Sequence, residues 1–215
     1  GDISCAAVVL ATGGFQGSSE LMKQYLGFEA AMNLAVRSNP ESNGGGLGLA
    51  LQAGASTSEA MEGFYGVVFA AIDEDLSESD FRALVIHHAV LGVVVGHDGR
   101  RLVDESAGAV GIARAIAPHG RAVLIFGREQ LVEAGCRLGE DATAILAKAR
   151  ARGARASGPL SLHEAAGLLD SWGYEGDRAA STLQTFDSLL NHPEASMQPT
   201  RHRFRIPVGT EDVFV

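Results

Sequence analysis

The sequence is poor in the residues that mark several protein classes. Of its 215 residues only Cys5 and Cys136 are cysteine, and they form neither a disulfide framework nor a metal-ligand spacing. This usage favours a reducing compartment, so we expect a cytoplasmic protein in which both thiols serve in packing. No stretch approaches the roughly 18 uninterrupted apolar residues of a membrane span, and no basic-then-apolar leader opens the chain.

Concentrated positive charge and catalytic signatures are also missing. There are 17 basic against 26 acidic residues, a net charge of −9, which argues against a nucleic-acid-binding protein. The seven histidines are scattered without ligand spacing, so no metal site is predicted. Neither a nucleophile elbow nor a phosphate-binding lysine loop is present. The 46% hydrophobic content fits an ordinary cored protein with one large or two small domains.

The most informative stretch that is present reads SCAAVVLATGG, residues 4–14. An unbroken apolar run that ends in glycines is typical of a strand covered on both faces, as in a parallel sheet whose ligands collect at the carboxyl end. Because the run begins at the fourth residue, nothing before it can supply neighbouring strands. The sequence therefore predicts the later part of a larger nucleotide-binding protein. Its apolar edge is expected to pair with another chain, which would give a homo-oligomer, or to be covered by the first helix.

Periodicity and capping residues predict the remaining elements. Helices are expected at 18–26, 47–53, 79–84, 107–117, 128–134, 141–152, 161–172 and 176–191. Extended segments are expected at 4–11, 33–38, 90–95, 101–103, 121–126 and 205–208, with a turn at 97–100.

Five segments in order resemble a known family. They are VVLATGGF, VRSNPESNGGGLGLALQAGA, LGVVVGHDGRRLVDE, ARAIAPHGRAVLIFG and LLDSWGYEGDRAASTLQTF. Together they resemble the fumarate reductase/succinate dehydrogenase flavoprotein family, which includes 3-ketosteroid dehydrogenases and a tricarballylate dehydrogenase branch, the last being nearest. The resemblance covers nearly the whole chain.

The resemblance implies a fold between α/β and α+β, namely a partial Rossmann-like FAD-binding segment plus an α+β cap domain. Residues 1–56 would end the first flavin-domain part, 57–205 would form the cap that covers the substrate, and 206–215 would begin the return to the flavin domain.

The glycine segments are the candidate cofactor site. Glycines let a backbone approach a pyrophosphate closely, and a helix start offers free N–H groups. From the residues alone, a plain strand-to-loop turn and a flexible loop are the alternatives. The resemblance places both segments against FAD, which makes the candidate cofactor-binding residues Ala11, Thr12, Gly13, Gly14, Asn43, Gly44, Gly45 and Gly46.

The substrate-side candidates are His87, His88, Arg101 and Glu105. Arginine and glutamate on a hairpin could hold the cap in place or face a carboxylate substrate; a surface salt bridge and histidine packing are the alternatives. In the resembled family an arginine in N-E-x-x-T-R donates the proton, and the matching position here is Ala109. That departure argues against fumarate reductase chemistry and leaves the catalytic residue unassigned.

The resulting prediction is part of an FAD-dependent oxidoreductase acting on a C–C/C=C bond of a small molecule, such as a carboxylate. The alternative is a non-enzymatic, cap-like binding or structural module. On either reading we expect the isolated chain to bind no flavin, because half of the cofactor site would lie elsewhere.

Overall fold

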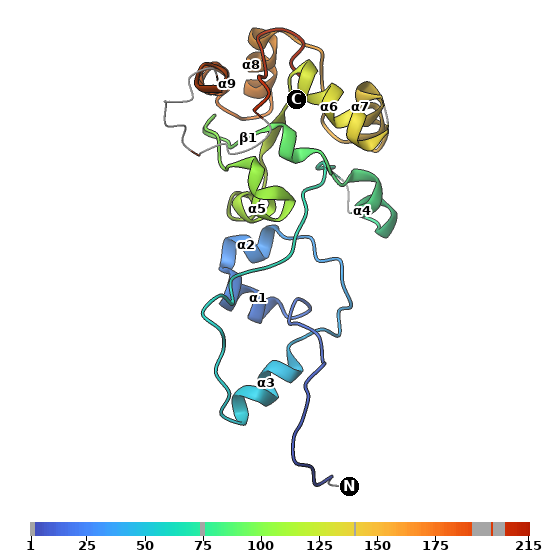
Figure 1. Ribbon diagram of the computed structural model, residues 1–215, viewed down its shortest axis with the longest axis vertical. Helices are drawn as coiled ribbons and strands as arrows, with labels where there is room; N and C mark the ends of the chain where they lie inside the picture. Colours follow the sequence, from blue (N-terminus) through green and yellow to red (C-terminus); the bar gives the residue numbers. More distant parts are fainter. Residues whose placement is uncertain (1–2, 74–75, 140, 191–198, 200–204) are drawn as a thin grey trace. The chain divides into compact units, whose positions relative to one another are not determined.

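The computed structural model describes residues 3–73, 76–139, 141–190, 199 and 205–215 (Figure 1). The chain divides into two compact units, Gly1–Gly63 and Phe64–Val215, and each is described by itself. The unit boundary falls near residue 57, where the sequence predicts the cap to begin, but the predicted domain assignments stay predictions.

In its described residues, 3–63, the first unit contains three helices, α1 (Ser19–Leu26), α2 (Phe28–Asn33) and α3 (Gly45–Gln52). Ser18 caps α1, since its hydroxyl accepts the Leu21 N–H at 3.3 Å, and Gly27 ends the helix with a φ of 87°. The helices predicted at 18–26 and 47–53 are therefore confirmed. The sequence did not predict α2, which follows directly after Gly27.

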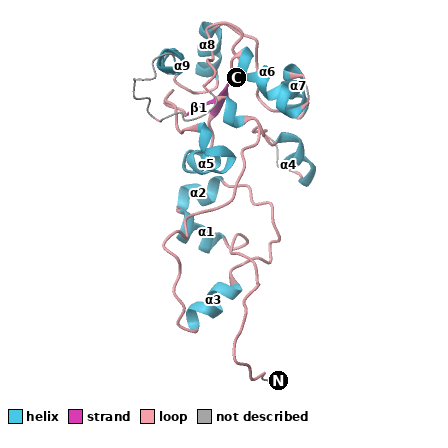
Figure 2. Ribbon diagram, viewed as in Figure 1, coloured by secondary structure: helices cyan, strands magenta, loops and turns pink. Residues whose placement is uncertain are grey.

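The strand predicted at 4–11 is wrong for this structure, whereas the Rossmann-like character of residues 1–56 is not shown and stays a prediction. Residues 7–14 form no regular element (Figure 2), and Val9 is 90% exposed. A strand needs a neighbouring backbone to take its hydrogen bonds, and the described part of the first unit contains no strand. Helix α1 does not cover the segment either, whereas pairing with another chain remains a prediction. The expected extension at 33–38 is replaced by the end of α2 and a loop.

The second unit is built on a small antiparallel sheet. Strand β1 (Val93–Val95) pairs with β2 (Val123–Ile125), with Val94 opposite Leu124. Side chains alternate across the sheet: Val93, Val95 and Ile125 face one core cluster, and Val94 faces another. This mostly helical unit with its two-stranded sheet agrees with the expected α+β cap-like domain.

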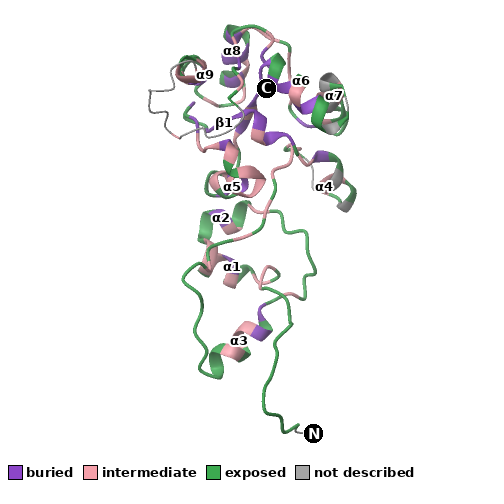
Figure 3. Cartoon of the chain, viewed as in Figure 1, coloured by how far each residue is buried: buried purple, intermediate pink, exposed green. Residues whose placement is uncertain are grey.

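Helices surround this sheet. They are α4 (Glu78–Leu84), α5 (Gly108–Ile116), α6 (Arg128–Leu138), α7 (Ala142–Ala151), α8 (Leu162–Ser171) and α9 (Gly176–Leu190), with short 3-10 turns η1 (Ala89–Leu91), η2 (Glu105–Ala107) and η3 (Ala117–His119). The buried β1 lies between α8–α9 on one side and α5 on the other (Figure 3). Ala179, Leu183 and Phe186 are buried as their helical spacing predicts.

The last residues of the chain enter this core. The backbone of Phe214 exchanges two hydrogen bonds with Phe126, and Val213 exchanges two with Leu160. Asp187 of α9 accepts the N–H groups of Val208 and Gly209 at 2.8 and 2.7 Å. Residues 205–208 form no strand, so the extended segment expected there is displaced to Val213 and Phe214, where partners exist.

The 97–100 turn is anchored to the α8–α9 connection. The rings of His97 and Tyr174 stack with centroids 4.3 Å apart, the Glu175 N–H donates to the His97 carbonyl, and the Thr182 hydroxyl donates to the Gly99 carbonyl at 2.7 Å. Gly99 has a φ of +71°, and a Cβ there would lie 2.5 Å from the Glu175 carbonyl oxygen. The expected return strand at 101–103 is reduced to a single bridge between Arg101 and Val95.

We predict that Gly99→Ala destabilises the second unit by about 2 kcal/mol more than Gly173→Ala. Both glycines have positive φ, but a Cβ at Gly173 meets nothing within 4 Å, so the control isolates backbone strain from the steric clash. Urea unfolding followed by circular dichroism measures the difference. Equal losses in the two variants would show that the turn does not need its close approach to α9.

Candidate functional site

The structure brings the two predicted cofactor segments together within the first unit. The Gly44 N–H donates to the Gly14 carbonyl at 3.1 Å, and a Cβ on Gly46 would lie 1.9 Å from the Thr12 hydroxyl oxygen. Segments 11–14 and 43–46 thus lie side by side, although about 30 residues separate them in the sequence.

The second of these segments opens helix α3. Gly44 is in the left-handed region with a φ of 82°, and the Asn43 side chain accepts the Gly45 N–H at 3.2 Å. The first turn of α3, which carries the partial positive charge of a helix N-terminus, therefore begins directly after this loop. The glycines at the start of the helix let the chain make this abrupt entry.

The space around each glycine shows whether its backbone is open to a bound dinucleotide or is already in contact with the rest of the chain. Gly44 and Gly46 are required by the chain itself, because a Cβ at these positions would meet Leu21 and Thr12. At Gly45 a Cβ would meet only the Asn43 side-chain oxygen, at 3.5 Å. The approachable backbone is therefore that of Gly45, which is exposed and begins a helix. These residues fit one edge of a dinucleotide site.

The two neighbouring histidines have different surroundings. His87 is exposed, whereas His88 is buried with its ring centroid 5.1 Å from that of Phe126. Burial, and to a lesser degree the neighbouring His87, lowers the pKa of His88 to about 4. His88 is therefore a neutral core residue at neutral pH, and His87 alone is accessible.

Arg101 and Glu105 form a buried ion pair. The Arg101 Nη2 lies 2.6 Å from the Glu105 Oε2, and the side-chain exposures are 3% and 0%. Glu105 also accepts the Val94 N–H at 2.8 Å, while Arg101 donates to the Pro199 carbonyl and lies 5.2 Å from the Phe186 ring centroid. The pair is thus built into the core between η2, β1 and α9.

Ala109, at the position of the resembled family's proton donor, lies in the first turn of α5 and is half-buried. Arg114, on the same helix, donates from Nε to the Phe64 carbonyl at 2.8 Å and packs on the Phe64 ring. The structure therefore brings no guanidinium to the Ala109 position from Arg114.

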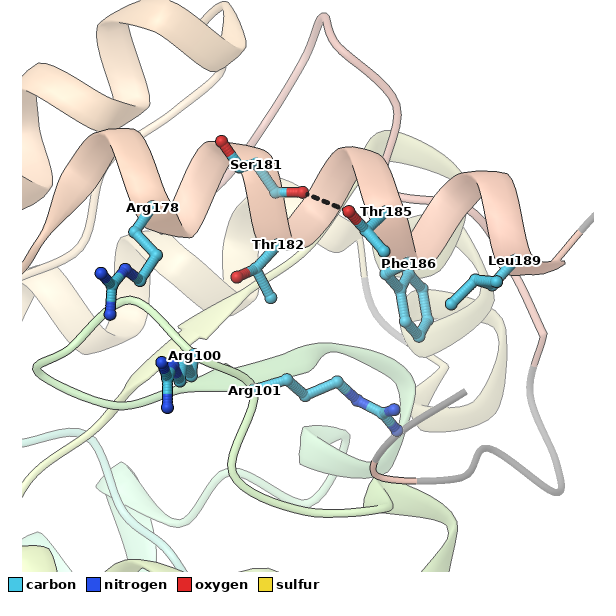
Figure 4. Close-up of a pocket in the computed structure, with 8 residues that line it drawn as sticks. All are labelled: Arg100, Arg101, Arg178, Ser181, Thr182, Thr185, Phe186 and Leu189. Carbon is cyan, nitrogen blue, oxygen red and sulfur yellow. Dashed lines mark hydrogen bonds between the residues drawn. The ribbon is translucent and has the colours of Figure 1, made fainter. Parts of the chain in front are cut away.

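The second unit also contains a cavity of about 320 Å³ that sequence reasoning missed (Figure 4). It is lined by Arg100, Arg101, Arg178, Ser181, Thr182, Thr185, Phe186 and Leu189. Its walls come from the 97–101 segment and from α9, about 80 residues apart, so no local motif marks it. The helical spacing of positions 178, 182, 185 and 189 was the one available signal.

Two kinds of feature are absent from the part of the chain that the structure describes. No group of three or more histidine, cysteine or acidic side chains is placed to hold a metal ion. Likewise, no described helix combines the length and apolar character needed to cross a bilayer. Cys5 and Cys136 are both exposed, which corrects the expectation that they serve in packing.

Comparison with known proteins gives a likeness of fold. No family model and no curated protein sequence matches the chain. A 3-ketosteroid-delta4-(5alpha)-dehydrogenase from Rhodococcus jostii RHA1 superposes with a TM-score of 0.59 at 18% identity, over 95% of this chain and 37% of that one. A 3-ketosteroid delta1-dehydrogenase from Sterolibacterium denitrificans gives 0.56 at 16% identity, over 94% and 39%. The chain thus shares a fold with part of these enzymes and spans less than half of their length.

We predict that Glu105→Gln costs about 3–5 kcal/mol of unfolding free energy, because it leaves the Arg101 charge buried without its counter-charge. The control is Glu133→Gln on α6, whose partner Arg137 is also four residues away but whose pair is half-exposed; it is expected to cost less than about 0.5 kcal/mol. Chemical denaturation measures both. If Glu105→Gln lowers the unfolding free energy no more than Glu133→Gln does, the ion pair is not structural, and Glu105 would again be a candidate for contact with a substrate.

We also predict that stability depends on His88 in mildly acidic solution. The unfolded chain takes up the proton near pH 6.5 and the folded protein only near pH 4, so stabilisation present above pH 6.5 is lost as the pH falls to 4, by up to about 3 kcal/mol. Urea unfolding between pH 4 and 7.5 measures this slope. His88→Leu should flatten it and His87→Gln should preserve most of it; an unchanged slope in His88→Leu would assign the effect to other groups.

Proposed function

We propose that this chain is part of an FAD-dependent oxidoreductase that acts on a C–C/C=C bond. The observation that carries the proposal is the fold likeness to two 3-ketosteroid dehydrogenases over almost all of the chain. The five ordered sequence segments support the same assignment independently of the coordinates. The proposal includes a closer relationship to the tricarballylate dehydrogenase branch than to other branches of the resembled family.

The side-by-side glycine segments support the cofactor assignment. The residues that would hold FAD are those of 11–14 together with Asn43 and the approachable Gly45, while Gly44 and Gly46 keep the two segments in contact. FAD, when bound, supplies the two-electron chemistry of oxidising or reducing the bond. The part of the chain within 1–56 would contribute one edge of the site, and chain outside these 215 residues would contribute the rest.

In this proposal the second unit acts as the cap, with 57–205 covering the substrate and 206–215 leading back to the flavin domain. The substrate is a small molecule whose reacting C–H bond lies near a carbonyl or carboxylate. The neighbours were crystallised with 4-androstene-3,17-dione and 1,4-androstadiene-3,17-dione, both ketones. With alanine at position 109, the proton transfer would fall to another group, and the accessible His87 is the remaining histidine candidate. The two free thiols suit the cytoplasm, where we place the protein.

A second candidate is a non-enzymatic binding or structural module that keeps the cap fold without flavin. The observation that favours it is that Gly44 and Gly46, two of the predicted cofactor glycines, are accounted for by packing within the chain. In that case the two glycine segments would only hold each other in place within the first unit.

The experiment compares flavin content in two proteins. The 215-residue chain alone is expected to purify colourless, and the product of the whole reading frame that contains it is expected to be yellow, with an absorbance band near 450 nm (roughly that of free flavin). In the whole product, Gly45→Val should lower FAD occupancy at least about tenfold by blocking close backbone approach.

The matched control is Gly48→Val. Gly48 lies in the same helix, and a Cβ there would meet nothing within 4 Å, so flavin content should be unchanged. A whole product that binds no added FAD would favour the structural module. Equal occupancy in the two variants would remove Gly45 from the cofactor site.

A further inference from the structure

We propose that the groove between the 97–101 turn and α9 binds a small amphipathic anion, a carboxylate attached to a short apolar chain. Nothing in the proposed flavin chemistry uses this groove, and none of its lining residues belongs to the glycine segments. Its volume of about 320 Å³ is at the lower end of the range of roughly 300–1,000 Å³ for small-molecule pockets.

The walls of the groove are held firmly. On one side the turn is fixed to the α8–α9 connection by the His97–Tyr174 ring stack and by the Glu175 amide on the His97 carbonyl. On the other side, Arg178, Thr182, Thr185, Phe186 and Leu189 follow one face of α9. The Thr182 hydroxyl joins the two walls through the Gly99 carbonyl. The two walls are therefore held relative to each other, which lowers the entropic cost of binding between them.

One end of the groove is cationic. Arg100 and Arg178 lie together at this end, across from each other on the turn and the helix (Figure 4). Each approaches an acidic side chain through its Nε, Arg100 towards Asp98 at 3.7 Å and Arg178 towards Glu175 at 3.3 Å. Both contacts are surface ion pairs, because the Arg100 and Arg178 side chains are 70% and 48% exposed, and a guanidinium group can also meet a ligand carboxylate through its terminal nitrogens.

The lining residues themselves carry positive charge. Among the described residues the lining contains three arginines and no acidic residue, and the acidic partners of those arginines, Asp98, Glu105 and Glu175, are not part of it. The helix dipole adds a partial positive charge at the first turn of the 15-residue helix α9, which Asp177 in the same turn offsets. A ligand carboxylate at this end would therefore compete with Asp98 and Glu175 for the two exposed guanidinium groups.

The opposite end is apolar. Phe186 and Leu189 lie at the far end of α9 from Arg178 (Figure 4). The Arg101 guanidinium extends below Phe186, but its charge is neutralised by Glu105 in the buried pair. A ligand seated on Arg100 and Arg178 would thus extend its apolar part along α9 toward Phe186 and Leu189. Because one end of the groove carries arginines and the other is apolar, we expect an amphipathic anion to bind more tightly than an inorganic anion.

The test uses the 215-residue chain and octanoate as the probe, with binding followed by ¹H–¹⁵N chemical shifts. We expect saturable binding that perturbs amides of 99–101 and 178–189. Acetate, which lacks the chain, and octanol, which lacks the charge, should each bind more than about tenfold more weakly. Raising the ionic strength should weaken octanoate binding, since the cationic end is open to solvent.

Variants assign the site. Arg178→Gln and Arg100→Gln should each weaken octanoate binding about tenfold. The matched control is Arg137→Gln on α6: Arg137 is 46% exposed and pairs with Glu133, four residues before it, as Arg178, at 48%, pairs with Glu175, three residues before it. It should change affinity less than about twofold. Unfolding midpoints confirm that the variants are folded.

Four outcomes would overturn the proposal. The first two are no saturable octanoate binding and octanoate binding that survives both groove substitutions. The other two are octanol binding and acetate binding as tight as octanoate binding, each of which would reject the amphipathic anion. None of these results depends on flavin, so the proposed oxidoreductase function stands or falls separately.

Discussion

The buried ion pair of Arg101 and Glu105 constrains how the elements of the second unit pack around it. Two opposite charges without access to water are tolerated only when their hydrogen bonds are satisfied. Here the Val94 amide meets Glu105, and the Pro199 carbonyl and Phe186 ring meet Arg101. Satisfying the pair therefore fixes strand β1, the start of η2 and the face of α9 in one arrangement. The position of the 97–100 turn, and with it the arginine-lined groove, follows from this.

Much of the helical structure could be read from the sequence because its signals are local. Ser18 and Gly27 bracket α1, and the spacing of Ala179, Leu183 and Phe186 marks the buried face of α9. Residues 4–11 show where this reasoning fails. Their apolar pattern is that of a buried strand, but a strand exists only where a second backbone accepts its hydrogen bonds. The strand predicted at 101–103 failed for the same reason, because only Arg101 forms a bridge to a neighbouring backbone, that of Val95.

The candidate sites were predictable to different degrees. Thr12, Gly14, Gly44 and Gly46 were grouped on the basis of glycine spacing and a family resemblance, and the structure places them in contact. Arg101 and Glu105 read as a hairpin pair on the surface or facing a substrate, since sequence reveals charge but not burial. The Arg100–Arg178 end of the groove was not predicted, because it depends on tertiary packing between distant segments.

The insertion of Val213 and Phe214 between Phe126 and Leu160 has a consequence for synthesis. These pairings span up to about 88 residues, so the loop closure they require is among the slowest steps in assembling the unit. Until residues 213 and 214 have been synthesised, the backbone groups of Phe126 and Leu160 lack the segment that they pair with in the folded unit. The core of the unit is therefore completed only after residue 214 has been added, and a chain shortened before residue 213 would expose apolar surface around Phe126.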